Sequence, residues 1–317
     1  MTIKHLCLTV LLCAAWSGFA GQTHTNPDTA AADPDFLIQG EYDKPGEGLQ
    51  IATLSPGKFL LSKLSGGLPG QGWDEKTVAV STATSADVKT VIEGYKRVQR
   101  QSPTLGEKAP AGAVVLFDGN ANEQWEGAKL ESGLLCEGTR TKQKFQSFKL
   151  HIEFRLPYKP DAPLGGQGRG NSGVYIFDRY EVQVLDSFGI HYFPNTHKAN
   201  WKEAFQRDLG AAASSDRTQW CGSLYHFKTP DLNMAYPPLA WQTYDIDFTA
   251  PKFEGEKKVA NARITVVHNG VKIQDNVELA KGTGAGGTKP ELSEGPIYLQ
   301  GHGNPVRFRN IWIVPQK

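Results

Sequence analysis

Apolar and polar residues alternate along most of the chain after residue 113, and this period of two predicts β-strands. In SFKLHIEFRLP, for example, Leu150, Ile152 and Phe154 alternate with His151 and Glu153. A strand of this kind turns one face to the core and keeps the other polar. The same reading predicts strands in NSGVYIFDRYEVQVLDS, WQTYDIDFTAP and GPIYLQGHGNPVRFRNIWIVP.

Turn residues separate these strands. ARITVVHNGVKIQDNVEL predicts a hairpin, because Asn269-Gly270 accepts the positive φ angles of a type I′ turn. Many short strands with turns between them predict an all-β fold, a two-sheet sandwich or jelly roll. The stretch 188–236 departs from the pattern because it is polar and aromatic, and we expect it to cross one face as a long, functional excursion.

The remaining chain divides by composition. Residues 21–35 are rich in Thr, Ala, Asp and Pro and are expected to form a flexible tether. Residues 36–102 read as a small β-rich N-terminal domain of short strands broken by Gly and Pro, closed by a short helix within 86–101. Residues 103–112, with two prolines, read as a linker to the jelly roll at 113–317.

The first 20 residues have the zones of a secretory signal peptide. Lys4 and His5 precede an apolar run from Leu6 to Trp16, and Gly18 and Ala20 permit cleavage before Gly21. The run is too short to span a membrane, which takes about 20 apolar residues. We therefore expect an exported protein, periplasmic or extracellular, with no membrane span.

Charge and cysteine content narrow the function further. The chain has 34 Lys+Arg and 33 Asp+Glu, and this formal net charge of +1 argues against a nucleic-acid partner. Cys136 and Cys221 remain after signal cleavage and either form one disulfide or stay as free thiols. No His/Cys spacing predicts a metal site, so we expect no cofactor, although a divalent metal stays open.

Polar side chains recur opposite the apolar faces of the predicted strands. Carboxylates, amides and Arg on one sheet face suit the hydroxyls of a carbohydrate, and aromatic rings suit its apolar face. The alternative is that these are ordinary solvated residues. The residues concerned are His151, Glu153, Arg155, Glu181, Gln183, Asp245, Asp247, Gln300, His302, Arg307 and Arg309.

Two stretches concentrate this chemistry. Within the strand that contains Glu181, the partner on the same face is the neutral Gln183, and Asp186 points away or lies past the strand end. Paired carboxylates about 5–5.5 Å apart, as retaining glycosidases use, are therefore disfavoured. In QGHGNPVRFR, His302 stands between two glycines, which let a ligand approach the backbone. Asn171-Ser172-Gly173 is a third candidate, either a ligand-facing turn or only a strand start.

Six segments together resemble one family. LFDGNANEQWEG, FKLHIEFRLP, GNSGVYIFDRYEVQVLDSFG, PPLAWQTYDIDFTAP, ARITVVHNGVKIQDNVEL and GPIYLQGHGNPVRFRNIWI are similar, in order, to the 3-keto-disaccharide hydrolase domain family. The resemblance covers about residues 113–315. It implies a concanavalin/laminin-G-like jelly roll in an exported protein. The segment ahead of it resembles a small domain often found before this family.

The family resemblance implies cleavage of glycosides that are already oxidised to a ketone at the third carbon. One base removes the acidified proton, hydrogen-bond donors hold the enolate, and the glycosidic oxygen leaves. By this resemblance, Glu181 and His302 are the catalytic candidates. The expected substrate-binding residues are Arg155, Asn171, Gln183, Asp186, Gln300, Asn304 and Arg307.

Two other functions stay open on the same fold: a non-catalytic carbohydrate-binding module, and a calcium-bearing adhesion domain. The sequence does not identify the natural glycan, which candidate is the base, whether hydrolysis or elimination takes place, or the oligomeric state.

Overall fold

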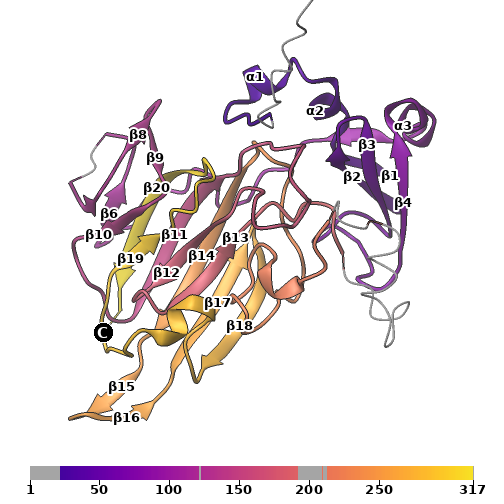
Figure 1. Ribbon diagram of the computed structural model, residues 1–317. Helices are drawn as coiled ribbons and strands as arrows, with labels where there is room; N and C mark the ends of the chain where they lie inside the picture. Colours follow the sequence, from indigo (N-terminus) through magenta and orange to yellow (C-terminus); the bar gives the residue numbers. More distant parts are fainter. Residues whose placement is uncertain (1–21, 121–122, 192–208, 210–212, 317) are drawn as a thin grey trace, which may run out of the picture.

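The computed structural model describes residues 22–120, 123–191, 209 and 213–316. These residues are almost entirely β-structure in antiparallel sheets, with only short helices (Figure 1). The all-β prediction is therefore confirmed. No helix in this described part is long and apolar enough to cross a membrane.

Two sheets form the jelly roll, which corresponds to the predicted domain at 113–317. One is five-stranded, in the order β13-β12-β19-β10-β7, and the other eight-stranded, in the order β18-β17-β14-β11-β20-β9-β8 with β6 beside β20. The five-stranded sheet comprises β7 (Trp125–Glu126), β10 (Thr139–Thr141), β12 (Ser172–Ile176), β13 (Tyr180–Val184) and β19 (Ile297–Leu299). The eight-stranded sheet comprises β6 (Val114–Phe117), β8 (Leu130–Glu131), β9 (Leu134–Cys136), β11 (Phe148–Arg155), β14 (Trp241–Thr249), β17 (Ala262–His268), β18 (Val271–Leu279) and β20 (Arg307–Pro315).

Three small elements complete the jelly roll. They are a separate hairpin of β15 (Lys252–Glu254) and β16 (Lys257–Ala260), and the short 3-10 helices η2 (Arg217–Gln219) and η3 (Gly284–Thr288).

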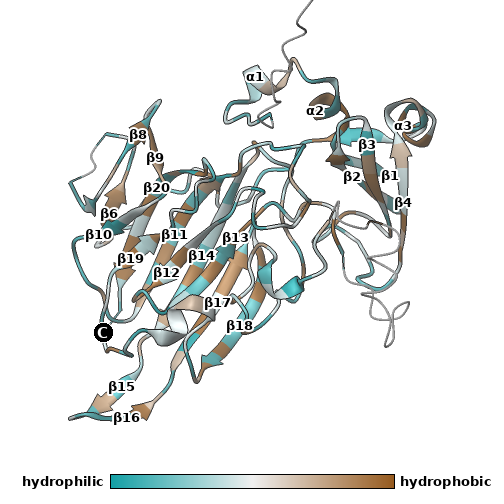
Figure 2. Ribbon diagram, viewed as in Figure 1, coloured by the Kyte–Doolittle hydropathy of each residue, from teal (hydrophilic) through white to brown (hydrophobic). Residues whose placement is uncertain are grey.

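The core lies between the two sheets. Apolar residues of alternating parity from both sheets form one buried cluster, for example Ile152 and Phe154 from β11 with Val174 and Val182 from β12 and β13. Figure 2 shows the bands of hydrophobic and hydrophilic residues that result along the strands. The predicted hairpin turn is also confirmed, because Asn269 and Gly270 have φ angles of 50° and 82°.

The N-terminal domain is one antiparallel sheet in the order β4-β3-β2-β1-β5. Its members are β1 (Gly40–Lys44), β2 (Glu47–Ser55), β3 (Lys58–Ser65), β4 (Val78–Thr84) and β5 (Lys96–Val98). The predicted helix is shorter than expected: α3 (Ser85–Val91) is held by a capping box between Thr84 and Asp87, and the chain then forms β5.

The N-terminal sheet packs on loops of the jelly roll. Ala52, Leu54 and Leu60 share a buried cluster with Leu164 and Phe188. Hydrogen bonds cross the same interface, from Ser62 Oγ to the Gly189 carbonyl (2.8 Å) and between His191 Nε2 and Gln50 Oε1 (2.5 Å). The two domains therefore share an interface that combines apolar packing with hydrogen bonds.

The described part of the predicted tether is ordered. After Gln22 come two short helices, α1 (Pro27–Ala30) and α2 (Pro34–Ile38), each with an Asn or Asp N-cap and Pro at its first position. Residue His24 pairs with Tyr158 through two backbone hydrogen bonds of 2.9 Å. The Asn26-Pro27 and Asp33-Pro34 pairs act as helix starts here, which the composition of the segment did not predict.

The first half of the predicted linker is bonded to the jelly roll. Thr104 Oγ1 donates to Asp245 (2.7 Å), the Gly106 amide donates to Glu153 (2.5 Å), and the Glu107 carbonyl accepts from Asn310 (2.9 Å). The linker thus lies across the outer face of the eight-stranded sheet.

Limited proteolysis should therefore spare residues 102–107. The hydrogen bonds of these residues to β11, β14 and β20 must break before a protease can bind the backbone, so cutting there should wait for local unfolding. Mass spectrometry of early fragments tests this, with the exposed tip of the β15–β16 hairpin as the internal comparison. An early cut within 102–107 would show that these contacts do not hold the linker.

The two cysteines are both free: Cys136 is half-buried and Cys221 is buried. The disulfide alternative is therefore wrong. Cys136 belongs to β9 of the eight-stranded sheet, whereas Cys221 packs in the core with its sulfur 3.1 Å from the Tyr244 hydroxyl.

Candidate functional site

The outer face of the five-stranded sheet carries two rows of side chains that point away from the core. Strand pairing places Glu181 opposite Tyr175, and Tyr175 opposite Tyr298, in one row. The second row is formed by Gln183, Gly173 and Gln300, because Gly173 pairs with Gln183 and its carbonyl accepts from the Gln300 amide (2.9 Å). The predicted residues Glu181, Gln183 and Gln300 are thus brought together on one face.

Gly173, in the second row, leaves space for the side chain of Glu181 in the first row. A Cβ atom at position 173 would lie 2.3 Å from Glu181 Oε1, closer than real atoms approach. The glycine therefore leaves space for the carboxyl group against the strand, and any side chain at position 173 would displace the carboxyl group from its present place.

The carboxyl group of Glu181 is strongly desolvated. The residue is 1% exposed, and burial raises the pKa of its side chain to about 7, although a hydrogen bond from Tyr175 acts in the opposite direction. A carboxyl with a pKa near neutrality can take up and release a proton at physiological pH, which is the property of a general base.

Two acceptor atoms on this face have no hydrogen-bond partner in the described structure. They are Glu181 Oε2 and Gln300 Oε1, both buried. When the Gln183 amide is oriented to suit its neighbours, its nitrogen lies 3.0 Å from Glu181 Oε1 and leaves Oε2 unpaired. Buried acceptors without donors are costly, and they suit a ligand that brings hydroxyl donors.

A chain of amide side chains runs from Gln183 in the second row to the segment 216–219. Gln183 lies 3.3 Å from Asn171, whose amide nitrogen donates to Gln167 (2.5 Å). Gln167 in turn donates to Gln219 (2.8 Å) in η2. Asn171 is therefore next to Gln183, as predicted, and belongs to a chain of amides that ends at the long excursion.

Asn304 anchors a loop. Its side-chain oxygen accepts from Lys159 (2.8 Å) and from the Gly170 amide (3.1 Å). These bonds tie the loop between β19 and β20 to the glycine-rich turn ahead of β12. The role that the structure shows for Asn304 is to position this loop, which carries His302.

His302 is exposed and stands in that loop, two residues beyond Gln300. Its carbonyl accepts from Asn304 Nδ2 (3.3 Å), and within the described residues no hydrogen bond joins its ring to Glu181. The two catalytic candidates therefore differ in exposure: Glu181 is buried in the sheet face, whereas His302 is exposed in a loop.

Asp186 does not face a ligand. Arg169 Nε donates to its Oδ2 (2.6 Å), the Phe188 amide donates to its Oδ1 (3.2 Å), and Asp186 and Arg169 are both 0% exposed. Both oxygens are used, so the expected substrate contact is replaced by a buried ion pair that holds the loops together. The prediction that Asp186 points away from the face of Glu181, or lies past the end of that strand, is therefore confirmed.

Arg155 and Arg307 lie on the other sheet. They pair with each other across β11 and β20, on the outer face of the eight-stranded sheet. Arg307 binds Glu131 and Glu137, and the Arg155 guanidinium lies over the Trp241 ring with 4.9 Å between them. The expectation that Arg155 shares one face with Glu181 was wrong, because alternation shows only that a residue faces away from the core, not from which sheet.

Polar residues of β11, β14 and β20 form an ion cluster beneath the linker. His151 Nδ1 lies 2.6 Å from Asp245, and Arg309 Nε lies 2.6 Å from Glu153. Burial opposes the charge on His151, but hydrogen bonds to Asp245 and Glu153 outweigh it and raise its pKa to about 9. Burial likewise disfavours the charged form of Glu153, and hydrogen bonds led by the one from His151 nevertheless lower its pKa to about 2.

The same cluster contains one group of potential metal ligands. Atoms of Glu107, His151 and Asp245 lie within 4.8 Å of one another. In the described structure Asp245 bonds to both His151 and Thr104, and the Glu107 carbonyl accepts from Asn310. These bonds hold the linker against the sheet.

Aromatic residues of the candidate face were missed by the sequence reading. Tyr175 and Tyr298 stand in the row of Glu181, with their rings 6.0 Å apart, and the Tyr225 amide donates to the Glu181 carbonyl (3.2 Å). Alternation along the strand does predict that Tyr175 faces away from the core, because it lies between the core residues Val174 and Ile176. Tyr175 was missed because only polar side chains were taken as candidates.

The comparisons with known proteins agree with this fold. Residues 112–314, more than half of the chain, match the family model described as the 3-keto-alpha-glucoside-1,2-lyase-like domain. The chain belongs to this family. Its two-sheet architecture and the order of its six segments are as the resemblance implied.

Solved structures of Parabacteroides distasonis ATCC 8503 proteins are similar to the chain. One, described as a "putative glycosyl hydrolase" and solved at 2.13 Å, is 31% identical with a TM-score of 0.51, over 66% of this chain and 86% of that chain. A second with the same description has 16% identity and a TM-score of 0.45, over 65% of this chain and 94% of that chain. No similar chain was found among curated proteins. The family and the first of these structures support a carbohydrate-active, glycoside-cleaving function.

Proposed function

We propose that the protein is an exported enzyme that cleaves the glycosidic bond of 3-keto-glycosides through an enolate intermediate, with Glu181 as the base. The observation that carries this proposal is the state of Glu181: a single buried carboxyl with its pKa raised to about 7 and one oxygen unpaired. Its neighbours on the face are Tyr175, Gly173 and Gln183, none of which is a second carboxylate.

One base suffices for a keto-sugar. The ketone at the third carbon acidifies the proton on the second carbon, and Glu181 takes that proton to leave an enolate. The enolate electrons then form a double bond between the first and second carbons and expel the glycosidic oxygen, which takes up a proton. Water adds across the double bond, or the unsaturated sugar leaves.

Donors beside Glu181 serve the enolate oxygen in this proposal. The Gln183 amide and the Tyr175 hydroxyl lie on the same face as the base, whereas Arg155 and Arg307 are on the other sheet. Preorganised donors at a desolvated site lower the barrier more than the same donors in water. His302, exposed at the end of the sheet, is the candidate for protonating the leaving oxygen.

Incubation with a 3-keto-disaccharide and with the matching unoxidised disaccharide tests the proposal. Release of a monosaccharide from the keto-sugar alone is the expected result, because an unoxidised sugar lacks the acidified proton. Cleavage of both substrates would indicate a conventional glycosidase. Binding of both without cleavage would indicate a carbohydrate-binding module.

The pH profile should report the base. Burial raises the pKa of Glu181 to about 7, so the carboxyl is protonated and inactive below that pH and becomes a base above it. We expect kcat/KM for the keto-disaccharide to rise about tenfold per pH unit below pH 7 and to level off above it. A profile that is flat from pH 5 to pH 8 would exclude a base with this pKa.

Export is expected from the first 20 residues, which lie outside the described part of the structure. Expression of the full chain in a bacterium with a secretion pathway should yield a mature protein that begins near Gly21. N-terminal sequencing of the periplasmic and secreted fractions measures this. An intact Leu6–Trp16 run in the exported material would refute cleavage by signal peptidase.

A further inference from the structure

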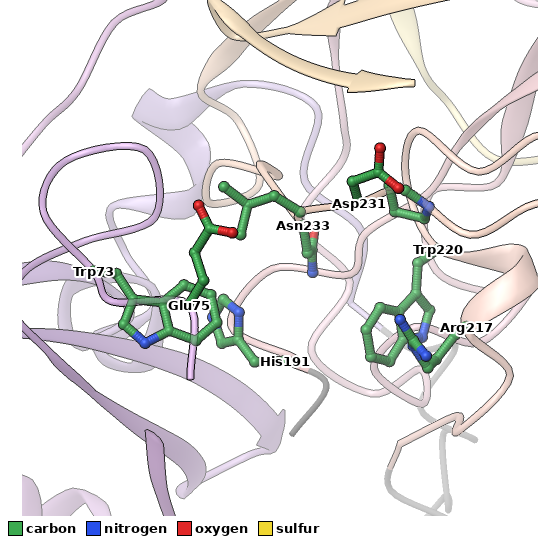
Figure 3. A pocket seen from close by; sticks show the side chains of 9 residues that line it. Trp73, Glu75, His191, Arg217, Trp220, Asp231 and Asn233 are labelled. Carbon is green, nitrogen blue, oxygen red and sulfur yellow. The ribbon is translucent and has the colours of Figure 1, made fainter. Parts of the chain in front are cut away.

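A pocket lies where the N-terminal domain meets the jelly roll. Its lining contains none of the residues in the two rows around Glu181. It has a volume of about 90 Å³, and its polar and aromatic lining comes from both domains. Figure 3 shows Trp73 and His191 on one side and Trp220 and Arg217 on the other, with Glu75 and Asp231 at its edge. The lining consists of Trp73, Glu75, His191, Arg217, Trp220, Pro230, Asp231, Leu232 and Asn233.

The N-terminal wall is built by a rigid loop between β3 and β4. The Trp73 indole donates to the Thr77 carbonyl (2.9 Å), and Asp74 accepts from the Thr77 amide (2.7 Å). Glu75, at the tip, has a φ angle of 57°, which is uncommon for a residue other than glycine. This conformation brings an exposed carboxylate to the pocket, and no ion pair with another described residue neutralises it.

The jelly-roll wall is equally fixed. Asn233 Nδ2 donates to the carbonyls of Ser187 (2.7 Å) and Ile190 (2.8 Å), which holds the back of the pocket. Trp220 is 2% exposed, and its indole nitrogen has no acceptor in the described structure. Across the pocket, burial keeps His191 uncharged by lowering its pKa to about 3.

This set of groups is suited to a neutral, hydroxyl-rich ligand. The carboxylates of Glu75 and Asp231 accept hydrogen bonds from hydroxyls, and indole rings pack against the apolar face of a sugar ring. Asp231 is paired with Lys228, and the negative charge of Glu75 stands against the positive charge of Arg217 in the same lining, so the charges around the pocket balance and favour a neutral ligand. We propose that this pocket is a second carbohydrate-binding site, to which the N-terminal domain contributes Trp73 and Glu75.

The pocket also adjoins the segment that leads to the proposed active site. The segment η2 supplies Arg217 to the pocket and, two residues later, Gln219 to the chain of amides that ends at Gln183. A sugar bound at the interface would therefore contact the same 3-10 helix that supports the Glu181 face. The N-terminal domain would in this way help to select carbohydrate rather than merely cover the loops.

Isothermal titration of the mature protein with maltotriose and with cellotriose tests the site. Neither sugar is oxidised, so binding is measured without turnover. We expect at least one of them to bind with a Kd tighter than about 1 mM. Glu75→Asn, which keeps a residue tolerant of positive φ, and Asp231→Asn should each weaken binding by about tenfold, the loss expected for a hydrogen bond to a charged group.

A control variant makes the result specific. Glu93→Asn changes another exposed carboxylate of the N-terminal domain outside the pocket, and it should leave the Kd unchanged. Titration measures binding and not turnover, so the result does not depend on the proposed reaction. The proposal is overturned if neither sugar binds, if both pocket variants bind as the parent does, or if only a protonated amine such as spermidine binds.

Discussion

Glu181→Gln should lower kcat/KM for a 3-keto-disaccharide by about 100-fold or more. The substitution keeps the shape of the side chain beside Gly173 but removes the only group on that face whose pKa is raised to about 7. General-base catalysis contributes about 10²–10⁴-fold in enzymes, so the loss should be at least of this size. Initial rates of monosaccharide release at pH 8 measure it.

The stability of the same variant separates loss of the base from loss of the fold. A carboxyl whose pKa rises from 4.5 to about 7 on folding is held protonated in the native state, so the native protein loses stability as pH rises through that window. Glu181→Gln removes this dependence and should melt no lower than the parent at pH 8. Glu126→Gln, an exposed position on β7 of the same sheet, is the matched control for activity. Full activity in Glu181→Gln would exclude Glu181 as the base.

His302→Ala distinguishes the second candidate. His302 is exposed on a loop anchored by Asn304, so its loss should not affect the fold. If His302 protonates the leaving oxygen, the variant should lose most activity on a substrate with a poor leaving group. It should lose little on an aryl keto-glycoside, whose leaving oxygen needs no proton. Equal losses on both substrates would place His302 in binding instead.

The alternation of residues along a strand predicted which residues face away from the core, but it could not predict on which sheet they lie. A period of two places Glu181 and Gln183 on one face and the core valines on the other, and the structure agrees. Parity cannot say which of two stacked sheets a strand joins, because both sheets have the same alternation. Arg155 was therefore grouped with Glu181 although β11 and β13 belong to different sheets.

The contacts of the predicted tether and linker escaped prediction for a different reason. Residues 21–35 and 103–112 have no apolar period, and their composition is typical of linkers. Ala30 packs in a small apolar cluster with Tyr158, and the bonds of the linker are long-range: Thr104 with Asp245, and the Glu107 carbonyl with Asn310. Such bonds depend on a polar sheet face elsewhere in the chain, so no local pattern reveals them. The ion pair of Asp186 with Arg169 likewise could not be predicted from the residues next to Asp186 in the sequence.

Asp186→Ala should lower the free energy of unfolding by about 3–5 kcal/mol, because it leaves the Arg169 charge buried without its carboxylate. Arg169 Nη1 also donates to the Thr53 carbonyl (2.9 Å) of the N-terminal domain, so the loss should extend across the interface between the domains. Urea unfolding followed by circular dichroism measures the change. Asp247→Ala, which breaks an exposed pair with Lys149, is the matched control and should cost less than about 1 kcal/mol.

The double variant Arg169→Met/Asp186→Leu tests the same ion pair by replacing both partners. Apolar side chains of similar size can replace a buried ion pair without a large loss, so the double variant should be more stable than Asp186→Ala alone. That order of stabilities would show that each charge is needed only to neutralise the other, and that neither position requires a charged side chain. A loss within 1 kcal/mol for Asp186→Ala would mean that the carboxylate is not buried with Arg169, and it would return Asp186 to the set of residues open to a ligand.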